Sequence, residues 1–576
     1  MLNLQEKDGL SSMTSLKKRL SQILLYAIEK GVQAGALVDD RRLTTDHRLS
    51  LELETPKNPE HGDFSANIAM VMASSQGQPP RKIAQIIINQ IVDTDKILQK
   101  IEVAGPGFIN FVIANNYWQD TLKQIQSKQD NYGASDHGKG KRVLMEFVSA
   151  NPTGPLHVGH GRGAAVGDTL CNILKFSGYH VEKEYYINDS GRQIKTLGLS
   201  VFLRYQELWG GKVEFPSDCY QGEYIRGIAK TIAEKDGKRL LDLPEQEGIS
   251  FCAKLASSVI LEEIKEDLKD FGVTFDQWFS EQSLFDAGEV DRFIEQFQTK
   301  GKIYSKEGAL WFRTTEHGDE KDRVVLRANN AMTYFASDIA YHAHKLNRNF
   351  DLLIDIWGAD HHGYIPRVHA CIEALGYNKE RLKIILINLV NLLRGGKIVA
   401  MSTRSGEFVP LRVVIDEVGK DPARFMFLTR RADSPLDFDL ELAKKKSNDN
   451  PVYYVQYVHA RISSILKKAQ EAGISNLKSQ LPIDLTLLSE PEEISLMKCL
   501  ERFPEIVSES AKFMEPHRIP VFLTELATAF HIYYNRHRVI TDRPDLTIAR
   551  LYLNETVRIV VKNGLVLAGV SAPETM

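Results

Sequence analysis

The sequence predicts an α/β fold built on a parallel β-sheet, preceded by a smaller α+β unit and followed by an all-helical unit. The runs 143–148 and 351–356 are apolar enough for buried strands, and each leads into a loop of glycine and polar residues. In 451–576, apolar residues recur at helical spacing. Open parallel sheets bind ligands beyond the carboxyl ends of their strands, so we expect a functional site there.

Bulk composition is that of a globular protein with several domains. The chain has 576 residues, of which 43% are hydrophobic and 26% are charged. Its net charge of −3 neither reveals nor excludes a nucleic-acid partner. We expect a cytoplasmic protein with no membrane segment, because no long apolar run or signal-peptide core occurs. Five scattered cysteines with no C-x-x-C argue against a cysteine zinc site: Cys171, Cys219, Cys252, Cys371 and Cys499.

The first unit, 10–128, mixes helix and strand patterns. An amphipathic helix face near its start precedes helix-like runs at 68–72 and 83–91. The segments 101–104 and 108–113 alternate like strands and are joined by a Gly-Pro-Gly turn. Phe108 and Asn110 fit ordinary strand positions, or a ring and an amide on an exposed sheet that read an unpaired RNA base. The polar, glycine-bearing stretch 129–140 is predicted to be a linker.

The second unit, 141–415, opens with a strand, a Pro/Gly-rich loop and a helix. The loop brings His157 and His160 to the helix start, where unpaired backbone N–H groups favour phosphate. Gly159 between them lets a flat base approach the backbone. Taken alone, H-x-x-H also fits a metal pair or a surface pair. A second strand is predicted at 178–187, and 198–323 is interpreted as helical insertions. Asp360 follows the strand run 351–356.

A basic, glycine-bearing loop follows at 394–406. By itself it fits a solvated surface loop. From about 416 the chain is predicted to be helical, with a connecting region at 416–450 and the all-helical unit at 451–576. In that last unit, aromatic residues are mostly core by base rate, and Tyr534, Arg536 and Arg538 are the candidates for contact with RNA.

The string 149–161 resembles the HIGH signature of class I aminoacyl-tRNA synthetases, and its surroundings resemble the arginyl enzymes. The resemblance implies a Rossmann-type catalytic domain that binds ATP with Mg²⁺ and holds no structural metal. The loop 394–406 resembles the second class I motif, KMSKS, although Ala400 and Thr403 replace its lysines. Either Lys397 or Arg404 would supply the missing cation, and the choice stays open. The implied ATP-site residues are His157, Gly159, His160, Gly161, Asp360, Met401 and Ser402, with His157, His160, Lys397 and Arg404 as the catalytic candidates.

The same resemblance implies an arginine pocket. A guanidinium is a planar fork of donors that needs carboxylate partners. Tyr334 and Asp338 are four residues apart, hence on one face if their segment is helical. Each residue alone also fits a structural role. The implied arginine-binding residues are Glu146, Ser149, Asn151, Tyr334 and Asp338.

Arginyl enzymes of the bacterial type carry an N-terminal domain that grips the tRNA D-loop and a helical anticodon-binding domain. The resemblance therefore places Phe108 and Asn110 on the D-loop, with Phe108 where some relatives have Tyr. It implies ATP-dependent attachment of L-arginine to tRNA(Arg) through arginyl-adenylate, releasing AMP and pyrophosphate. It also implies that arginine activation needs bound tRNA. We expect a monomer.

Two other functions compete. A zinc hydrolase would arrange histidines as ligands, but no H-E-x-x-H occurs and two of the pairs lie in loops. A non-catalytic RNA-binding protein would explain the altered second motif, but the intact pocket residues argue against it. The histidines considered as ligands are His157, His160, His342, His344, His361 and His362.

Overall fold

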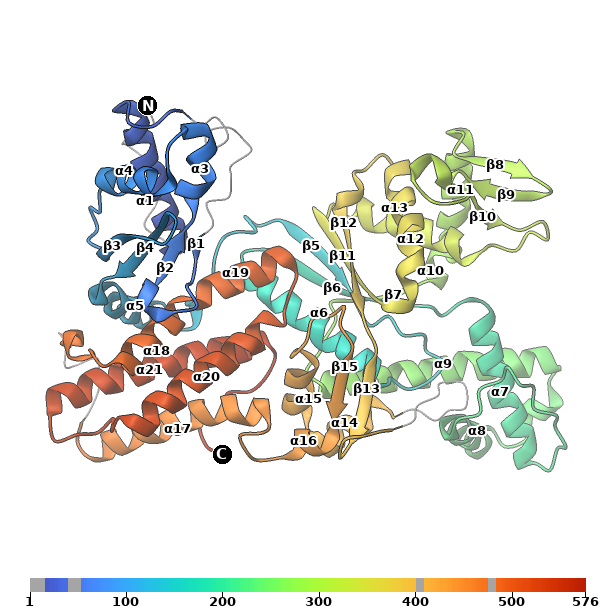
Figure 1. Cartoon of the computed structure of the whole chain (residues 1–576). Helices are drawn as coiled ribbons and strands as arrows, with labels where there is room; N and C mark the ends of the chain where they lie inside the picture. Colours follow the sequence, from blue (N-terminus) through green and yellow to red (C-terminus); the bar gives the residue numbers. More distant parts are fainter. Residues whose placement is uncertain (1–15, 40–52, 400–408, 475–482) are drawn as a thin grey trace.

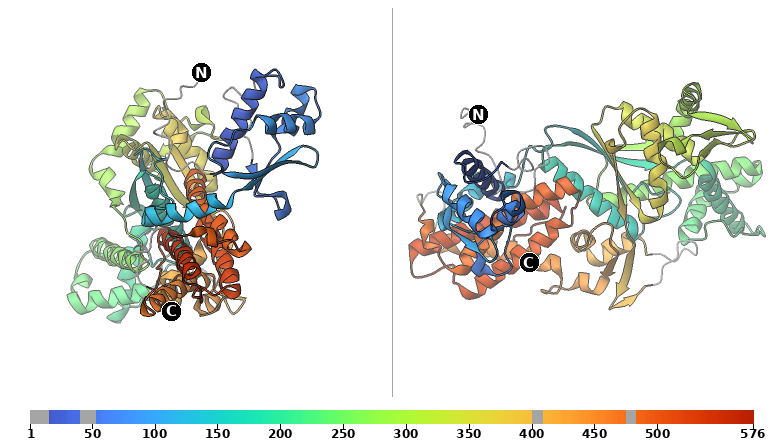
Figure 2. Two further views of the ribbon diagram at one scale, coloured as in Figure 1. Left: turned by 90° about the vertical axis from the view of Figure 1, so that its left-hand side faces the viewer. Right: turned by 45° about the horizontal axis from the view of Figure 1, so that its top comes forward.

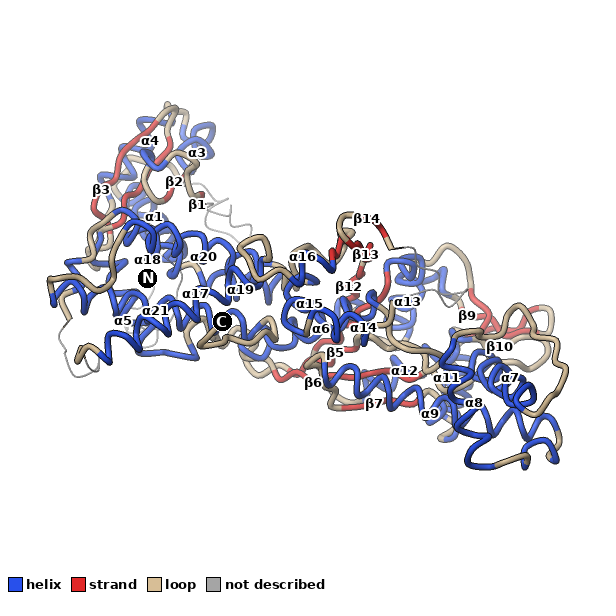
Figure 3. Tube along the Cα trace, turned by 90° about the horizontal axis from the view of Figure 1, so that it is seen from below, coloured by secondary structure: helices blue, strands red, loops and turns tan. Residues whose placement is uncertain are grey.

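The computed structural model describes residues 16–39, 53–399, 409–474 and 483–576. The molecule is elongated, with the N-terminal unit and the last helices at one end and α7, α8 and α9 at the other (Figure 1). The view from below shows the same order along the long axis (Figure 3). The main sheet lies between these ends. The predicted three-part architecture is confirmed.

The N-terminal unit is a four-stranded antiparallel sheet with helices, ordered β1-β2-β4-β3. The predicted strand pair exists as β3 and β4, and the turn between them contains Gly105 and Gly107 at positive φ. Helix α5 follows the sheet but packs against α18 and α21 of the C-terminal unit. The elements are α1 (Leu16–Gln33), β1 (Leu53–Glu54), β2 (Phe64–Ala66), α3 (Ile68–Gln76), α4 (Pro80–Gln90), β3 (Leu98–Ala104), β4 (Phe108–Ile113) and α5 (Asn115–Lys128).

The central sheet has five parallel strands in the order β12-β11-β5-β6-β7. The chain runs outward from β5 through β6 to β7, then returns to β11 and continues to β12. The switch point therefore lies between β5 and β11, where loops diverge and ligands of such sheets bind. The elements are β5 (Arg142–Glu146), α6 (Val158–Phe176), β6 (His180–Ile187), β7 (Gln277–Ser280), α12 (Tyr334–Asn347), β11 (Leu352–Gly358), α13 (Ile365–Ala374) and β12 (Leu382–Ile387).

The stretch 198–323 is not one helical insertion. Strand β7 lies inside it and forms the edge of the main sheet, and β8, β9 and β10 form a separate antiparallel sheet. The prediction missed them because β7 is only four residues long and joins a sheet whose other strands are distant in sequence. The elements are α7 (Gly191–Leu208), α8 (Glu223–Asp236), α9 (Glu245–Asp270), α10 (Gln282–Asp286), α11 (Glu289–Thr299), β8 (Ile303–Lys306), β9 (Ala309–Phe312) and β10 (Arg323–Leu326).

After the main sheet the chain forms a small sheet, β14-β13-β15, in which β13 and β15 are parallel. Strand β15 lies within 416–450, so the prediction of an all-helical connecting region is wrong there. Its partner β13 is supplied by a distant segment, which local periodicity does not report. The elements are β13 (Val390–Arg394), β14 (Lys397–Ile398), α14 (Leu411–Val418), α15 (Lys420–Phe427), β15 (Leu436–Asp439) and α16 (Leu440–Lys444).

The C-terminal unit is a bundle of long helices, seen end-on and from above in Figure 2. Asn450 caps the first helix by accepting from the Val452 N–H, and Pro451 occupies its first position. Lys498 pairs with Asp63 of the N-terminal unit, which docks the two units. Within the described residues, no helix is long and apolar enough to cross a membrane. The helices are α17 (Pro451–Glu471), α18 (Pro491–Glu501), α19 (Phe503–Phe513), α20 (Arg518–Arg536) and α21 (Pro544–Leu567).

Candidate active site

The two-histidine loop leaves β5 at the switch point and starts α6. His157 is the N-cap: its Nδ1 accepts the Gly159 N–H at 3.1 Å. His160 Nδ1 accepts the His157 N–H at 3.2 Å, which closes a reciprocal capping box. Both Nδ1 atoms therefore act as acceptors, so in each neutral ring the proton is on Nε2. The rings stack with centroids 3.7 Å apart.

Burial keeps both imidazoles neutral. It lowers the pKa of His160 to about 3, with His157 as a second cause. It also lowers the pKa of His157. Neutral Nε2–H groups at a helix N-terminus are hydrogen-bond donors toward an anion, and the dipole of α6 has the matching sign. The loop therefore offers neutral donors of the kind that suit phosphate oxygens.

The two glycines of the motif have different neighbours. A side chain on Gly159 would press on the His157 ring, with Cε1 at 3.0 Å, so this glycine leaves room for the capping histidine. A Cβ on Gly161 would lie 2.6 Å from Leu411 and 3.2 Å from Phe427. Gly161 thus allows α6 to pack closely on α14 and α15. No structural observation bears on its predicted contact with ATP.

The segment between β5 and the histidines is strained and firmly held. Val148 and Ser149 both have positive φ, at 68° and 41°, which non-glycine residues adopt at a cost of about 1–3 kcal/mol each. The Tyr185 hydroxyl donates to the Ala150 carbonyl at 2.8 Å. Tyr224 does the same to Thr153 at 2.8 Å. Such strain persists only where surrounding contacts fix it, as at ligand sites.

An acidic cluster lies beside this loop, between the main sheet and α12. Glu146 ends β5 and is 7% exposed, and Asp338 lies on α12, which begins at Tyr334 as the spacing predicted. Burial raises the pKa of Asp338 to about 6; the Tyr364 hydroxyl that binds it acts in the opposite direction. His342 also acts to lower this pKa, and the charges of Glu281 and Glu146 act to raise it.

The predicted arginine-binding residues divide into two groups. Glu146, Ser149 and Asp338 converge: Ser149 Oγ donates to Glu146 Oε1 at 2.9 Å. Tyr334 is one turn before Asp338 and is exposed, so its ring lies at the rim. Asn151 donates to Gln193 Oε1 at 2.5 Å on the solvent side of the loop.

The sequence reasoning missed several pocket residues. Glu281, 2% exposed, follows β7 and accepts from Ser190 Oγ at 2.6 Å. The Tyr186 side chain interacts with Glu281. Burial and Glu281 both raise the pKa of Tyr186. Tyr364 binds Asp338. The available signal was position: Glu281 and Ser190 each follow a strand of the main sheet.

The second motif is only partly described. Met401, Ser402 and Arg404 lie outside the described residues. Lys397 is exposed on β14, opposite Arg394 in the hairpin that leads to them. Beyond them, Pro410 forms a β-bridge with His157, and the Leu411 N–H donates to the Leu156 carbonyl at 2.7 Å. The chain that leaves this motif is therefore fixed to the histidine loop. Asp360 is exposed at the end of β11, in the 3₁₀ turn Ala359–Tyr364.

The predicted RNA contacts lie at the far end of the molecule. Phe108 is half-buried on β4, but Asn110 is only 3% exposed and accepts from Ser65 Oγ at 2.8 Å. The expectation that both lie on an exposed face is therefore wrong for Asn110. Its neighbours from β2 and β3 cover it, which the sequence of β4 alone does not show.

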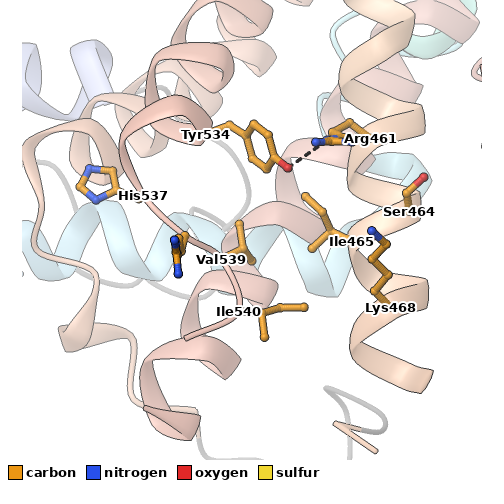
Figure 4. A pocket seen from close by; sticks show the side chains of 9 residues that line it. Arg461, Ser464, Ile465, Lys468, Tyr534, His537, Val539 and Ile540 are labelled. Carbon is orange, nitrogen blue, oxygen red and sulfur yellow. Dashed lines mark hydrogen bonds between the residues drawn. The ribbon is translucent and has the colours of Figure 1, made fainter. Parts of the chain in front are cut away.

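Tyr534 and Arg538 line a cavity of about 320 Å³ between α17 and the end of α20 (Figure 4). Arg461 Nε donates to the Tyr534 hydroxyl at 2.9 Å, and Lys468 adds a further cation. Arg536 instead pairs with Glu492. An aromatic ring flanked by cations suits a nucleotide base and its phosphate.

The histidines considered as zinc ligands serve other purposes. His342 contacts Asp355 at 3.2 Å, and His344 contacts Glu289 at 3.3 Å. Over the described ranges, the one cluster with metal-ligand spacing is Glu490, Glu492 and His537, and its Glu492 is already paired with Arg536.

The comparisons with known proteins agree with this geometry. Residues 121–431, more than half of the chain, match the family model described as tRNA synthetases class I (R), catalytic domain. The fold and the histidine loop at its switch point are thus those of a class I aminoacyl-tRNA synthetase. Residues 16–113 match the arginyl tRNA synthetase N terminal domain, and 455–576 match the DALR anticodon binding domain.

Full-length relatives narrow the class. The chain is 56% identical to the arginine–tRNA ligase of Desulfosudis oleivorans and 53% identical to that of Geobacter sp. strain M21, in each case over 97% of this chain and all of the relative. The Thermus thermophilus arginyl-tRNA synthetase has the same fold, with a TM-score of 0.75 at 21% identity over 97% of this chain and all of that one. The chain belongs to the arginyl-tRNA synthetase family.

Proposed function

We propose that this chain is an arginine–tRNA ligase that attaches L-arginine to tRNA(Arg) with ATP. The observation that carries this proposal is a group of three largely buried carboxylates next to the histidine loop: Glu146 is paired with Lys345, whereas Asp338 and Glu281 have hydroxyl donors and no lysine or arginine partner among the described residues. A guanidinium meets three nearby carboxylates there, and it is the one amino-acid side chain that remains a planar cation at any working pH.

The reaction runs in two steps. A carboxylate oxygen of arginine attacks the α-phosphorus of ATP, a new P–O bond forms, and the bond to the β-phosphate breaks to release pyrophosphate. The 2′-hydroxyl of the terminal adenosine then attacks the carbonyl carbon of arginyl-adenylate, and AMP leaves. ATP enters as its Mg²⁺ complex, the usual form of this substrate.

The protein acts by positioning and by charge stabilisation. His157 and His160 donate Nε2–H bonds to phosphate oxygens as charge builds on them. Asp338 and Glu146 hold the guanidinium, Tyr334 closes the rim, and Asn151 and Ser149 lie toward the α-amino and carboxylate end. Asp360, Gly159, Gly161, Met401 and Ser402 belong to the proposed nucleotide site. Lys397 or Arg404 supplies a cation for the departing pyrophosphate.

The tRNA spans the length of the molecule in this proposal. Its D-loop meets the N-terminal sheet at Phe108, with Asn110 beneath the surface, and its anticodon meets the C-terminal cavity at Tyr534 and Arg538, with Arg536 beside it. Bound tRNA is needed for arginine activation. The enzyme acts as a cytoplasmic monomer.

Charging bulk tRNA with each of the twenty amino acids tests the activity. We expect label to enter tRNA with arginine alone. Charging with another amino acid, or with none, contradicts the proposal. ATP–pyrophosphate exchange with and without tRNA then tests the coupling: exchange that runs fully without tRNA contradicts the tRNA requirement.

A further inference from the structure

Three acidic residues form a row across the middle of the main sheet. Asp355 on β11 pairs in register with Glu146 on β5, and Glu146 pairs with Glu184 on β6. Residues paired in register on adjacent strands point to the same face and lie about 5 Å apart. All three are buried, at 1%, 7% and 0% exposed. Three buried negative charges at this separation repel one another, so nearby cations are needed to stabilise them.

Helix α12 supplies those cations. Lys345, which is 0% exposed, donates from Nζ to Asp355 Oδ1 at 2.8 Å and also to Glu146 Oε2. Arg348 pairs with Glu184 Oε2 at 2.6 Å and also donates to Gln277 at 2.7 Å. Lys345 therefore neutralises Asp355 and Glu146, whereas Arg348, the C-cap residue of α12, neutralises Glu184.

Glu146 is the member of the row that reaches the pocket. Its Oε1 accepts from Ser149 at 2.9 Å and its Oε2 accepts from Lys345. The single Tyr341 O–H lies between Glu146 Oε2, at 2.9 Å, and Glu184 Oε1, at 2.7 Å. A carboxylate offers about four lone-pair sites, so three described donors leave room for one more. Asp338 lies seven residues before Lys345 on α12, hence on the same face of the helix.

We propose that Lys345 is a positioning residue for arginine: it holds the Glu146 carboxylate in place, with one acceptor site turned toward the guanidinium. This inference rests on the proposed arginine–tRNA ligase function. Lys345 itself is fully buried, and two of its three N–H donors are used by Glu146 and Asp355, so we assign it no contact with the substrate. Without it, Glu146 would face Asp355 and Glu184 with no cation of its own and would turn away or take up a proton.

Arg348 provides a matched control. Arg348 is the C-cap residue of the same helix and binds the same acidic row, but its carboxylate partner is the fully buried Glu184 and not Glu146. Loss of either cation leaves a buried acid unpaired and destabilises the fold. Only loss of Lys345 alters the carboxylate that meets arginine.

The test compares Lys345→Met, Lys345→Arg and Arg348→Met in tRNA charging, with KM for arginine and for ATP measured separately. We expect Lys345→Met to raise the arginine KM at least about tenfold while the ATP KM stays within about twofold. Lys345→Arg should recover most of the loss. Arg348→Met should lower Tm to a similar extent and leave the arginine KM within about threefold. An unchanged arginine KM in Lys345→Met, or an equal rise in Arg348→Met, overturns the inference.

A second set of variants, built on Glu146→Gln, tests the inference even if Lys345→Met alone folds poorly. Removing both partners of a buried pair costs less than removing one, so Glu146→Gln with Lys345→Met should fold better than Lys345→Met alone. If Lys345 acts through Glu146, adding Lys345→Met to Glu146→Gln leaves the arginine KM unchanged. A further multiplicative rise contradicts this route. Failure of the unmodified protein to charge tRNA with arginine would reject the function, whereas normal charging with no selective effect of Lys345 rejects only this inference.

Discussion

Two buried acidic clusters in the catalytic unit differ in how their charge is balanced. In the first, Asp168 on α6 binds Arg424 at 2.5 Å and also Lys183, so one carboxylate meets two cations. Burial acts to raise the pKa of Asp168, but Arg424 and Lys183 outweigh it and the net pKa is lowered. In the second, burial raises the pKa of Asp338 to about 6, although the bound Tyr364 hydroxyl and His342 act to lower it; the charges of Glu281 and Glu146 act to raise it.

The first cluster is complete and joins parts of the fold. Arg424 also donates to the Ala568 carbonyl at 3.1 Å and the Phe271 carbonyl at 3.3 Å, which ties α6 to the end of α21 and the end of α9. Among the described residues, no lysine or arginine pairs with Asp338: the Tyr364 hydroxyl binds it, and His342 is the basic side chain that acts to lower its pKa. We infer from this comparison that Asp168, paired with two cations, joins parts of the fold, whereas Asp338, which has no such pair, is the expected place of a cationic ligand.

The largest effect is expected at Asp338. Asp338→Asn removes a buried partner of the guanidinium, and breaking such a pair costs about 3–5 kcal/mol, so kcat/KM for arginine should fall about 10²–10⁴-fold. Stability of the empty protein should not fall, because an unfavourable buried charge is removed. Steady-state charging and thermal unfolding measure the two effects. Marked destabilisation with intact arginine kinetics would show that Asp338 is structural.

Arg424→Met should show the reverse pattern. It leaves Asp168 with Lys183 alone and breaks the junction, so the free energy of unfolding should drop by about 3 kcal/mol in urea titrations. The arginine KM of the folded fraction should stay within about threefold. A selective rise in arginine KM would mean that the junction belongs to the arginine site.

Glu281→Gln should have a smaller effect on arginine than Asp338→Asn. Glu281 is bound by Ser190 and adds negative charge near Asp338, so we expect about a tenfold rise in arginine KM. The Glu281→Gln substitution should also lower the pKa of Asp338, because the negative charge that helps to raise this pKa is removed. The pH profile of arginine binding measures this, and a profile that does not move would place Glu281 outside the pocket.

The contributions of Asp338 and Asp168 to stability should change with pH in opposite directions. The folded pKa of Asp338 is raised, so its ionised form costs stability as pH rises through about 6, and arginine offsets that cost. Arginine affinity should therefore fall by up to about tenfold per pH unit below about 6. The pKa of Asp168 is lowered, so its contribution to stability is present above the unfolded value and is lost as pH falls through the folded one. Arginine binding that does not change between pH 7 and 5 would contradict the assignment.

The sequence predicted the parts of the site whose structure depends on residues that are neighbours in the chain. The sequence around 149–161 predicts the strand, the loop and the helix that carry the two histidines. The spacing of Tyr334 and Asp338 predicts that they share one helix face. Lys345 and Glu281 were not predicted, because their roles come from strands that meet only in the folded sheet. Asn110 was misjudged for the same reason: β2 and β3 cover it. Strands β7 and β15 are short and depend on distant partners, so no run of apolar residues marks them.

Binding of arginine and of citrulline, its uncharged isostere, tests the central claim most directly. Both are titrated calorimetrically into the protein in the presence of tRNA and a non-hydrolysable ATP analogue. If an unbalanced buried acid cluster recognises the guanidinium charge, arginine binds at least about a hundredfold more tightly than citrulline, and Asp338→Asn narrows that ratio. Equal affinity for the two ligands would contradict the account.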